Sequence, residues 1–165
     1  MNTMFENLYA CKELHSILFY SICEKYNLTI AEILVLLYLA GAKGNDTAKD
    51  IVDKLKLTKS HVSLSVRSLK KRGYLTGSYE DGNHRTVHLS LCDMARGPVA
   101  DARKVEAQFV SIIEKGFSRD ETVAFAQYLS RATENMNAFL ILQSKSNRGE
   151  RSRYDKKSKY WRSYQ

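Results

Sequence analysis

The strongest constraint on the fold is residues 46–91, where the apolar spacing predicts two short helices followed by two short strands. Asp46 or Thr47 can cap the first helix, and Thr58 or Ser60 can cap the second. Each helix has one apolar stripe to bury: Ala48, Ile51, Val52 and Leu55 in the first, and Val62, Val66 and Leu69 in the second. The short connection at residues 56–58 makes this pair a helix-turn-helix.

The outward face of the second helix carries hydroxyl and basic side chains, and no carboxylate occurs between residues 58 and 72. A helix exposed to solvent usually carries both acidic and basic side chains, which form ion pairs one turn apart. A face of one sign instead suits the major groove of DNA, where arginine reads guanine and serine reaches phosphates or bases. His61, on the flank, is either a solvated edge residue or a phosphate contact. At about 100° per residue the face comprises Ser60, Ser63, Leu64, Arg67 and Lys71.

A β-hairpin is predicted directly after this helix, which Gly73 ends. Its strands are residues 74–76 and 86–91, and the polar stretch 80–85 is its tip. Helix, turn, helix and hairpin in this order make a winged helix, in which Arg85 stands where a wing can reach the minor groove. The second strand places three apolar residues on one side: Val87, Leu89 and Leu91.

Two predicted helices precede this region. Residues 30–42 are apolar nearly all round and form a buried helix, which Thr29 and Glu32 can start with a capping box. Residues 4–26 form an amphipathic helix that is too apolar for a simple surface helix. Its broad apolar face comprises Leu8, Cys11, Leu14, Leu18 and Ile22, widened by Phe5, Phe19 and Tyr26.

Two further helices are predicted after the hairpin. One either starts or bends at Pro98 and runs to about Lys115, and the last follows a capping box at Ser118 and Glu121. A winged helix can fold largely by itself and does not need the flanking helices to cover its core. Much of the apolar surface of those helices therefore stays uncovered and needs a partner. A second copy of the chain, related by a two-fold axis, is the simplest one. The two stripes are Val99, Ala102, Val105, Phe109, Ile112 and Ile113, then Phe125, Leu129, Ala132, Met136, Phe139 and Leu140.

The net charge of +8 is segregated along the chain. Residues 43–85 hold ten Lys/Arg and five Asp/Glu, and residues 143–165 hold eight and two, whereas the remaining segments are slightly acidic. A basic excess confined to the winged helix and the tail favours nucleic-acid binding over a uniformly solubilising charge. The tail has no apolar periodicity. It is either a disordered solubilising end or an arm whose cations bind phosphate and whose aromatic residues stack.

The order of these motifs resembles the MarR family of bacterial transcriptional regulators, over residues 5–142. The matching residues are Leu28, Thr29 and Glu32 at a buried helix start, Ser60, His61, Val62, Ser63, Val66, Leu69 and Gly73 in the recognition helix, and Arg85 in the wing. The departures from the family pattern are Asn83 for the wing Asp, Cys92 and Ala95 for the Thr and Gly of the closing motif, and Leu64 for a polar or basic residue.

The resemblance implies a homodimer with interlocked terminal helices, whose two recognition helices bind a pseudo-palindromic operator. It also implies an effector pocket between the dimer helices and the winged helix, often for small aromatic acids. The expected organisation is a winged-helix DNA-binding domain over residues 28–92, a helical dimerisation region over 1–27 and 93–142, and a basic, disordered tail over 143–165. Aromatic residues of the first two helices are either core or pocket walls: Phe5, Tyr9, Phe19, Tyr20, Tyr26 and Tyr38.

Other classes of function have weaker support. The sequence has no catalytic triad order, carboxylate pair, phosphate loop or metal-ligand cluster, so we expect no enzyme, cofactor or metal site. Cys11 and His15 have the spacing of two zinc ligands but no second pair, and a buried thiol is the expected state of Cys11. No signal peptide and no run of about 20 apolar residues occurs, and the three cysteines have no paired spacing. We therefore expect a cytoplasmic protein without membrane contacts.

These patterns predict a mainly α protein with a small β-hairpin, in which dimerisation helices flank a winged helix-turn-helix. The expected function is sequence-specific binding of double-stranded DNA by a homodimeric, ligand-responsive repressor. Two alternatives remain open: a winged-helix module for protein interaction or nonspecific nucleic-acid binding, and a thiol- or metal-sensing regulator. The residues expected to contact DNA are Ser60, His61, Ser63, Leu64, Arg67, Lys71 and Arg85.

Overall fold

The computed structural model describes residues 3–80 and 83–146, with the backbone alone at residues 80, 83–85 and 144–146. The predicted tail beyond residue 146, residues 81–82 at the hairpin tip and the side chain of Arg85 lie outside the described part. The described residues fall into two compact units, which divide between Ile113 and Glu114.

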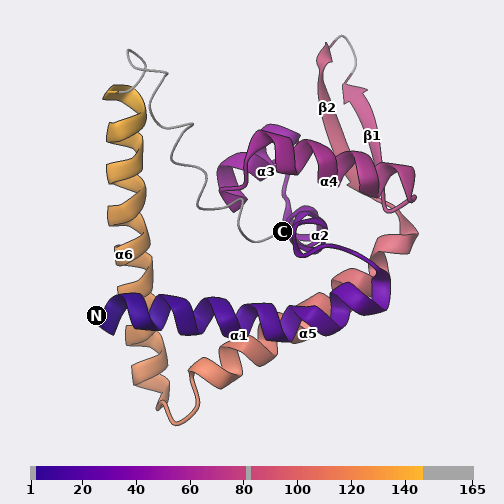
Figure 1. Ribbon diagram of the computed structural model, residues 1–165. Helices are drawn as coiled ribbons and strands as arrows, with labels where there is room; N and C mark the ends of the chain where they lie inside the picture. Colours follow the sequence, from indigo (N-terminus) through magenta and orange to yellow (C-terminus); the bar gives the residue numbers. More distant parts are fainter. Residues whose placement is uncertain (1–2, 81–82, 147–165) are drawn as a thin grey trace. The chain divides into compact units, whose positions relative to one another are not determined.

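The first unit is mainly helical and contains one antiparallel hairpin (Figure 1). Helix α1 lies along α5, while α2 contacts α4, α5 and β2. The predicted fold class, a winged helix with flanking helices, is confirmed. In chain order the elements are α1 (Thr3–Tyr26), α2 (Ile30–Gly41), α3 (Ala48–Leu55), α4 (Lys59–Lys71), β1 (Leu75–Glu80), β2 (Asn83–Leu91), the 3₁₀ helix η1 (Asp93–Ala95) and α5 (Arg96–Ile113).

Helix α2 is the buried centre of this unit. Ile33, Val35 and Leu36 have no exposed surface, because α4, α5 and β2 all pack against the helix. Its start is the predicted capping box. Thr29 Oγ1 accepts the Glu32 N–H at 3.2 Å, and a Glu32 carboxylate oxygen accepts the Thr29 N–H at 2.8 Å. These bonds satisfy N–H groups that the start of a helix otherwise leaves without partners.

Local caps fix the ends of the helix-turn-helix. Thr47 caps α3 in a capping box with Asp50, and Thr58 caps α4 by accepting the His61 N–H at 3.2 Å. Gly73 follows α4 with a φ of +76°, a left-handed conformation that glycine adopts without a steric cost. One of the two cap candidates for each helix, and the predicted end of α4, are thus confirmed.

The buried stripes of α3 and α4 agree with the prediction except at one position. Ile51, Val62 and Leu69 are at most 1% exposed. Ala48 was expected in the same stripe but is exposed, because the first residue of α3 lies at the open end of the helix pair. Three other members of the stripes are half-buried against the core: Val52, Leu55 and Val66.

The hairpin is longer than predicted. Its strands pair from Leu75 and Leu91 as far as Glu80 and Asn83, so the backbone at residues 80 and 83–85 belongs to strands rather than to the tip. Polar composition suggested a loop there, but cross-strand hydrogen bonds depend on the backbone and form with polar side chains as well. The predicted apolar side of β2 is confirmed, because Leu89 is 4% exposed and its two neighbours on that side are half-buried.

Asp46 holds the base of the wing against the start of α3. Its backbone carbonyl accepts the Leu89 N–H at 3.0 Å, and its carboxylate lies 2.5 Å from His88 Nδ1. Asp46 was the other candidate cap for α3. Instead of capping that helix, it fixes the orientation of the hairpin relative to the helix-turn-helix.

A polar cluster around Asp101 joins α1 to α5. The Asp101 carboxylate accepts hydrogen bonds from Lys25 at 2.6 Å, from Tyr26 at 2.8 Å and from Lys104 at 3.0 Å. The hydrogen bonds from Lys25, then Lys104 and the Tyr26 hydroxyl, hold the pKa of Asp101 well below its ordinary value.

Replacing Asp101 by asparagine should lower the thermal midpoint at neutral pH and should matter less in acid. The cluster favours the charged carboxylate, so its stabilising contribution is fully present above the unfolded-state pKa of about 4. That contribution is lost as the pH falls through the lower folded-state pKa. Thermal melting at about pH 7, pH 4 and pH 2.5 measures the effect.

The matched control is Asp93→Asn, which removes a carboxylate that is 88% exposed and pairs with Arg96. Exposed pairs contribute little, so this variant should melt like the unmodified chain. A deficit of Asp101→Asn that stays the same at every pH would contradict the role given to the charged cluster.

The end of α4 is also tied to α1. The Arg72 guanidinium, directly after α4, donates to the Tyr26 carbonyl at 2.9 Å and to the Asn27 carbonyl at 2.7 Å. Tyr26 therefore contacts α5 through its hydroxyl and the end of α4 through its backbone. A displacement of the end of α1 would thus act directly on the end of α4.

Helix α5 begins two residues before Pro98, so this proline lies in the first turn, where its missing N–H breaks no helical hydrogen bond. The helix ends at Ile113 rather than at Lys115, and Gly116 turns the chain with a φ of +90°.

In the second unit, α6 (Arg119–Ser146) starts with the predicted capping box, and it extends past residue 143, where the tail was expected to begin.

Candidate nucleic-acid interface

Helix α4 presents one face to the core and the opposite face to solvent. Val62 and Leu69 are buried, and contacts with α2 and α3 hold this inner face in place. Of the seven residues expected to contact DNA, the structure brings six together; the seventh, Arg85, contributes its backbone to β2. The exposed six are Ser60, His61, Ser63, Leu64, Arg67 and Lys71.

The exposed face of α4 is basic, and no acidic residue of the helix neutralises its charge. The helix contains no acidic residue, and within the described part of the chain Lys59, Arg67, Lys70 and Lys71 form no ion pair. Four cations on a helix of 13 residues therefore remain available to an external anion. Lys59 and Lys70 were not predicted as contacts, because both lie on the flanks of the helix rather than at the centre of its outward face.

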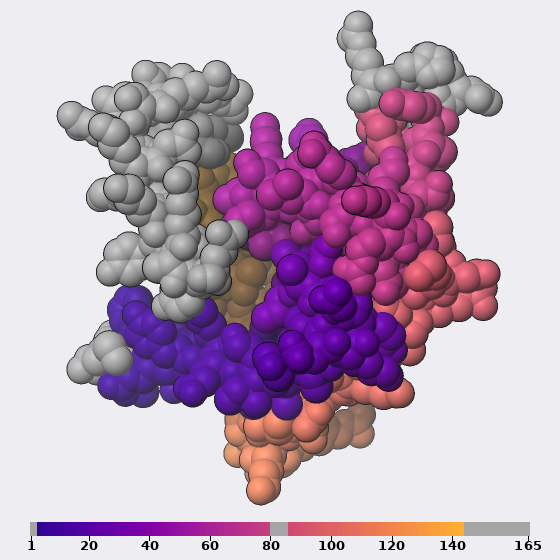
Figure 2. Space-filling model, turned by 45° about the vertical axis from the view of Figure 1, so that its right-hand side comes forward, coloured from indigo at the N-terminus to yellow at the C-terminus, as the bar shows by residue number. Residues whose placement is uncertain are grey.

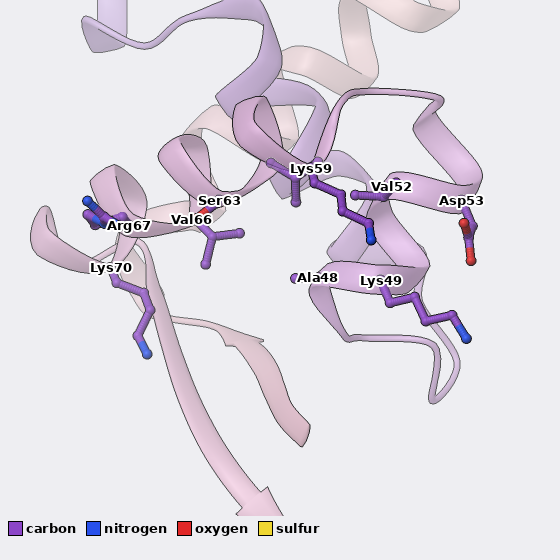
Figure 3. Close-up of a pocket in the computed structure, with 10 residues that line it drawn as sticks. Ala48, Lys49, Val52, Asp53, Lys59, Ser63, Val66, Arg67 and Lys70 are labelled. Carbon is purple, nitrogen blue, oxygen red and sulfur yellow. The ribbon is translucent and has the colours of Figure 1, made fainter. Parts of the chain in front are cut away.

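A groove of about 870 Å³ lies between α3 and α4 and continues this face (Figure 3). Lys49 and Asp53 extend from α3, while Lys59, Arg67 and Lys70 extend from α4. An extended anion with apolar parts, such as a sugar–phosphate backbone, matches this combination of cations and apolar surface. The remaining lining is small or apolar: Ala48, Val52, Val62, Ser63 and Val66.

Sequence reasoning missed Lys49 as a site residue. The basic excess over residues 43–85 was the available signal, but it did not show which lysines share a surface with α4. Packing of α3 against α4 decides that, and places Lys49 beside the same groove as Lys59.

Lys70 extends the basic surface from α4 toward the wing. A Cβ atom at Gly77 of β1 would lie 2.8 Å from Lys70 Nζ and 2.8 Å from a methyl group of Val87, so the missing side chain at residue 77 leaves space for the lysine. Figure 2 shows α3, α4 and the strands as neighbouring parts of one face. Several described strand residues beside this edge are exposed: Thr76, Ser78 and Tyr79.

The six aromatic residues considered as pocket walls lie in different environments. Phe19 is 1% exposed in the core. The Tyr26 hydroxyl bonds to α5, and the Tyr38 hydroxyl donates to the Asn45 carbonyl at 2.7 Å. Core packing thus accounts for Phe19, and hydrogen bonds between elements account for the two tyrosine hydroxyls. The other three are more than half exposed: Phe5, Tyr9 and Tyr20.

The expected burial of Cys11 is wrong, because its side chain is exposed. Burial along α1 begins only at Leu14, so the part of the apolar stripe that contains Cys11 is not covered in this chain. His15, one turn later, stacks on Phe19 with ring centroids 4.4 Å apart, and burial lowers the pKa of this histidine. Among the described residues, no group of three metal-ligating side chains occurs.

Comparison with known proteins gives one match in sequence and many in fold. The sequence model of the MarR family matches residues 26–85. A putative MarR family regulator from Listeria monocytogenes, solved with 26mer DNA, is 17% identical; the alignment covers 92% of this chain and 99% of that one, with a TM-score of 0.77. A MarR regulator from Methanosarcina mazei Go1 is 16% identical, with coverages of 84% and 92% and a TM-score of 0.72.

BpsR from Bordetella bronchiseptica, whose DNA binding is regulated by 6-hydroxynicotinic acid, is 22% identical, with coverages of 80% and 99% and a TM-score of 0.65. No curated protein sequence matches significantly. Over residues 3–80 and 83–146, no helix combines the length and apolar character needed to cross a membrane. Residues 26–85 thus match the MarR family in sequence, and the chain shares the winged-helix fold of solved MarR-family regulators.

Proposed function

We propose that this protein is a transcriptional regulator of the MarR type that binds double-stranded DNA as a homodimer, with α4 in the major groove and the wing at the adjacent minor groove. The exposed face of α4 carries the proposal, because it offers cations and hydroxyls without a carboxylate. An α-helix with its side chains is about 10–12 Å wide, which fits a major groove of about 12 Å. In this arrangement Arg67 contacts a guanine edge, Ser60 and Ser63 contact bases or phosphates, and Lys71 contacts phosphate.

Residues on the flanks of α4 fix its position on the duplex. Lys49 and Lys59 stand beside the groove between α3 and α4, where one DNA strand can pass, and His61 adds a phosphate contact. Arg85 inserts into the minor groove from the wing. Contacts of this kind determine the position of the protein on the duplex and its affinity. The contacts of α4 to base edges determine which DNA sequence is preferred.

The homodimer is supported by apolar side chains that the single chain leaves uncovered. Near the start of α1, three of them are 55–60% exposed: Phe5, Leu8 and Tyr9. On α6, Met136, Phe139 and Leu140 are also more than half exposed. Exposed apolar surface of this extent marks an interaction site, and a second copy of the chain supplies matching helices. Two copies place two α4 helices on a pseudo-palindromic operator.

In this proposal the dimer represses transcription by occupying the operator, and a small aromatic effector releases it. Such an effector must bind the released form of the dimer more tightly than the DNA-bound form. BpsR, which shares the fold, provides the precedent of regulation by an aromatic acid. The link from α1 to the end of α4 through Arg72 gives a route from the dimer helices to the recognition helix.

The test starts with enrichment of duplexes from a random-sequence pool by the full-length protein. An enriched duplex and a random duplex are then titrated at two salt concentrations. We expect a preference of about 10³-fold or more for the enriched duplex, and a particle mass of two 18.9 kDa chains in light scattering. Equal binding to both duplexes that disappears as salt rises would instead support the nonspecific or protein-interaction alternative.

Lys71→Ala should weaken binding to the enriched and the random duplex by the same factor. The lysine contacts phosphate in this proposal, so its removal reduces by about one the slope of log affinity against log salt concentration. Titrations at four or more salt concentrations give that slope. Lys115→Ala, at an exposed lysine that follows α5 and lies outside the proposed interface, is the control that should leave the slope unchanged. A loss confined to the enriched duplex would contradict a phosphate role for Lys71.

A further inference from the structure

Leu64 is an unusual residue on the surface of the winged helix. Among the described residues between 28 and 92, two large apolar side chains are more than half exposed, Leu64 at 60% and Tyr79 at 55%. They lie on α4 and on the wing strand β1, the two elements that the proposed function brings to DNA. Leu64 lies away from the buried face of Val62 and Leu69, so core packing does not require an apolar residue there.

The neighbours of Leu64 are the polar residues assigned to DNA contacts. At 3.6 residues per turn, Leu64 lies within a sector of about 60° around the helix axis that also holds Ser60, Arg67 and Lys71. The sector lies opposite the buried residues Val62 and Leu69; of its members, Arg67 also lines the groove beside α3, and Leu64 does not. When α4 enters the major groove, Leu64 therefore faces the base edges rather than solvent.

We propose that Leu64 selects thymine at one position of each half-site by contact with the thymine C5-methyl group; this inference rests on the proposed binding of DNA by α4. A leucine side chain has no hydrogen-bond donor or acceptor, so it gains nothing from the N7, O6, O4 or amino groups of the major groove. The thymine methyl is the one apolar group displayed there, and apolar side chains contact it in DNA complexes. Contact removes both apolar surfaces from water.

The position of this thymine follows from the spacing along α4. Leu64 and Arg67 are three residues apart, about 4.5 Å along the helix axis, and successive base pairs are about 3.4 Å apart. The selected thymine should therefore lie next to, or one pair beyond, the base pair contacted by Arg67. An enriched operator should contain this thymine near a guanine in both half-sites.

Deoxyuridine substitution tests the contact, because it removes the methyl group and leaves the pairing and every hydrogen-bonding group unchanged. In the enriched duplex, each thymine is replaced in turn, and affinities are measured for the full-length protein and for Leu64→Ala. We expect one thymine per half-site at which deoxyuridine lowers the affinity of the unmodified protein about fourfold. This is the change that corresponds to the burial of one methylene-sized group. For Leu64→Ala the two duplexes should bind equally.

Two further variants make the result specific. Leu64→Met keeps an apolar side chain and should retain most of the methyl dependence, whereas Lys71→Ala should bind less tightly but keep the full dependence. Leu64→Ala is expected to fold, because it changes an exposed side chain, and circular dichroism and thermal melting verify this. The assignment would be overturned if deoxyuridine at a thymine lowered the affinity of the unmodified protein and of Leu64→Ala equally. It would also be overturned if deoxyuridine lowered the affinity at no thymine. Either result would leave sequence-specific binding intact. Failure to enrich any duplex would overturn the proposed function and this inference together.

Discussion

Arg67→Ala is expected to weaken binding to the enriched duplex by about 1–3 kcal/mol, roughly 5- to 150-fold, and to relax the preference at one base pair. The physical reason is the paired geometry of a guanidinium with the O6 and N7 atoms of guanine, which alanine cannot replace. Arg67 is exposed and forms no ion pair among the described residues, so its removal leaves no buried charge behind. Titration of the enriched duplex, and of duplexes with each base at the sensitive position, measures both effects.

Arg67→Lys separates recognition of the base from simple charge. Lysine keeps the positive charge but lacks the planar fork of donors. It should therefore restore affinity for random DNA but only part of the sequence preference. If Arg67→Ala reduced binding to enriched and random duplexes equally, Arg67 would be a phosphate contact, and the base-reading role would have to pass to another residue of α4.

Sequence patterns predicted the elements whose signals are local. Capping residues stand within three positions of the groups they bind, so Thr29, Thr47, Thr58 and Ser118 marked four helix starts that the structure confirms. Apolar periodicity likewise distinguished the buried face of α4 from its exposed face, which is why six predicted site residues occur together on one surface.

Features that depend on contacts between distant segments could not be predicted in the same way. The pairing of Asp46 with His88 and the bonds from Arg72 to the end of α1 join residues more than 40 positions apart. The place of Lys49 in the interface depends on how α3 packs on α4. The exposure of Cys11 depends on the residue of α1 at which other parts of the chain begin to bury the helix. Periodicity shows which face of a helix is apolar, but it does not show which part of that face the same chain covers.

Leu69→Ala is expected to lower the free energy of unfolding by about 2–5 kcal/mol. Leu69 is fully buried, where it joins the inner face of α4 to the core formed with α2. Truncation removes apolar contacts and leaves a cavity that the surrounding helices fill only in part. Its backbone carbonyl also accepts the Tyr74 N–H at 2.9 Å, so the last turn of α4 and the entry into the wing should loosen together. Urea unfolding at one fixed protein concentration measures the loss.

Leu64→Ala is the matched control, since it makes the same chemical change five residues away on the same helix. Leu64 is 60% exposed, so its truncation should alter the free energy of unfolding by less than about 0.5 kcal/mol. The pair should therefore separate stability from DNA recognition: Leu69→Ala destabilises the fold, whereas Leu64→Ala keeps the fold and loses the thymine methyl contact. Equal destabilisation by both variants would mean that Leu64 is covered in the assembled dimer, and α4 could not then present it to DNA.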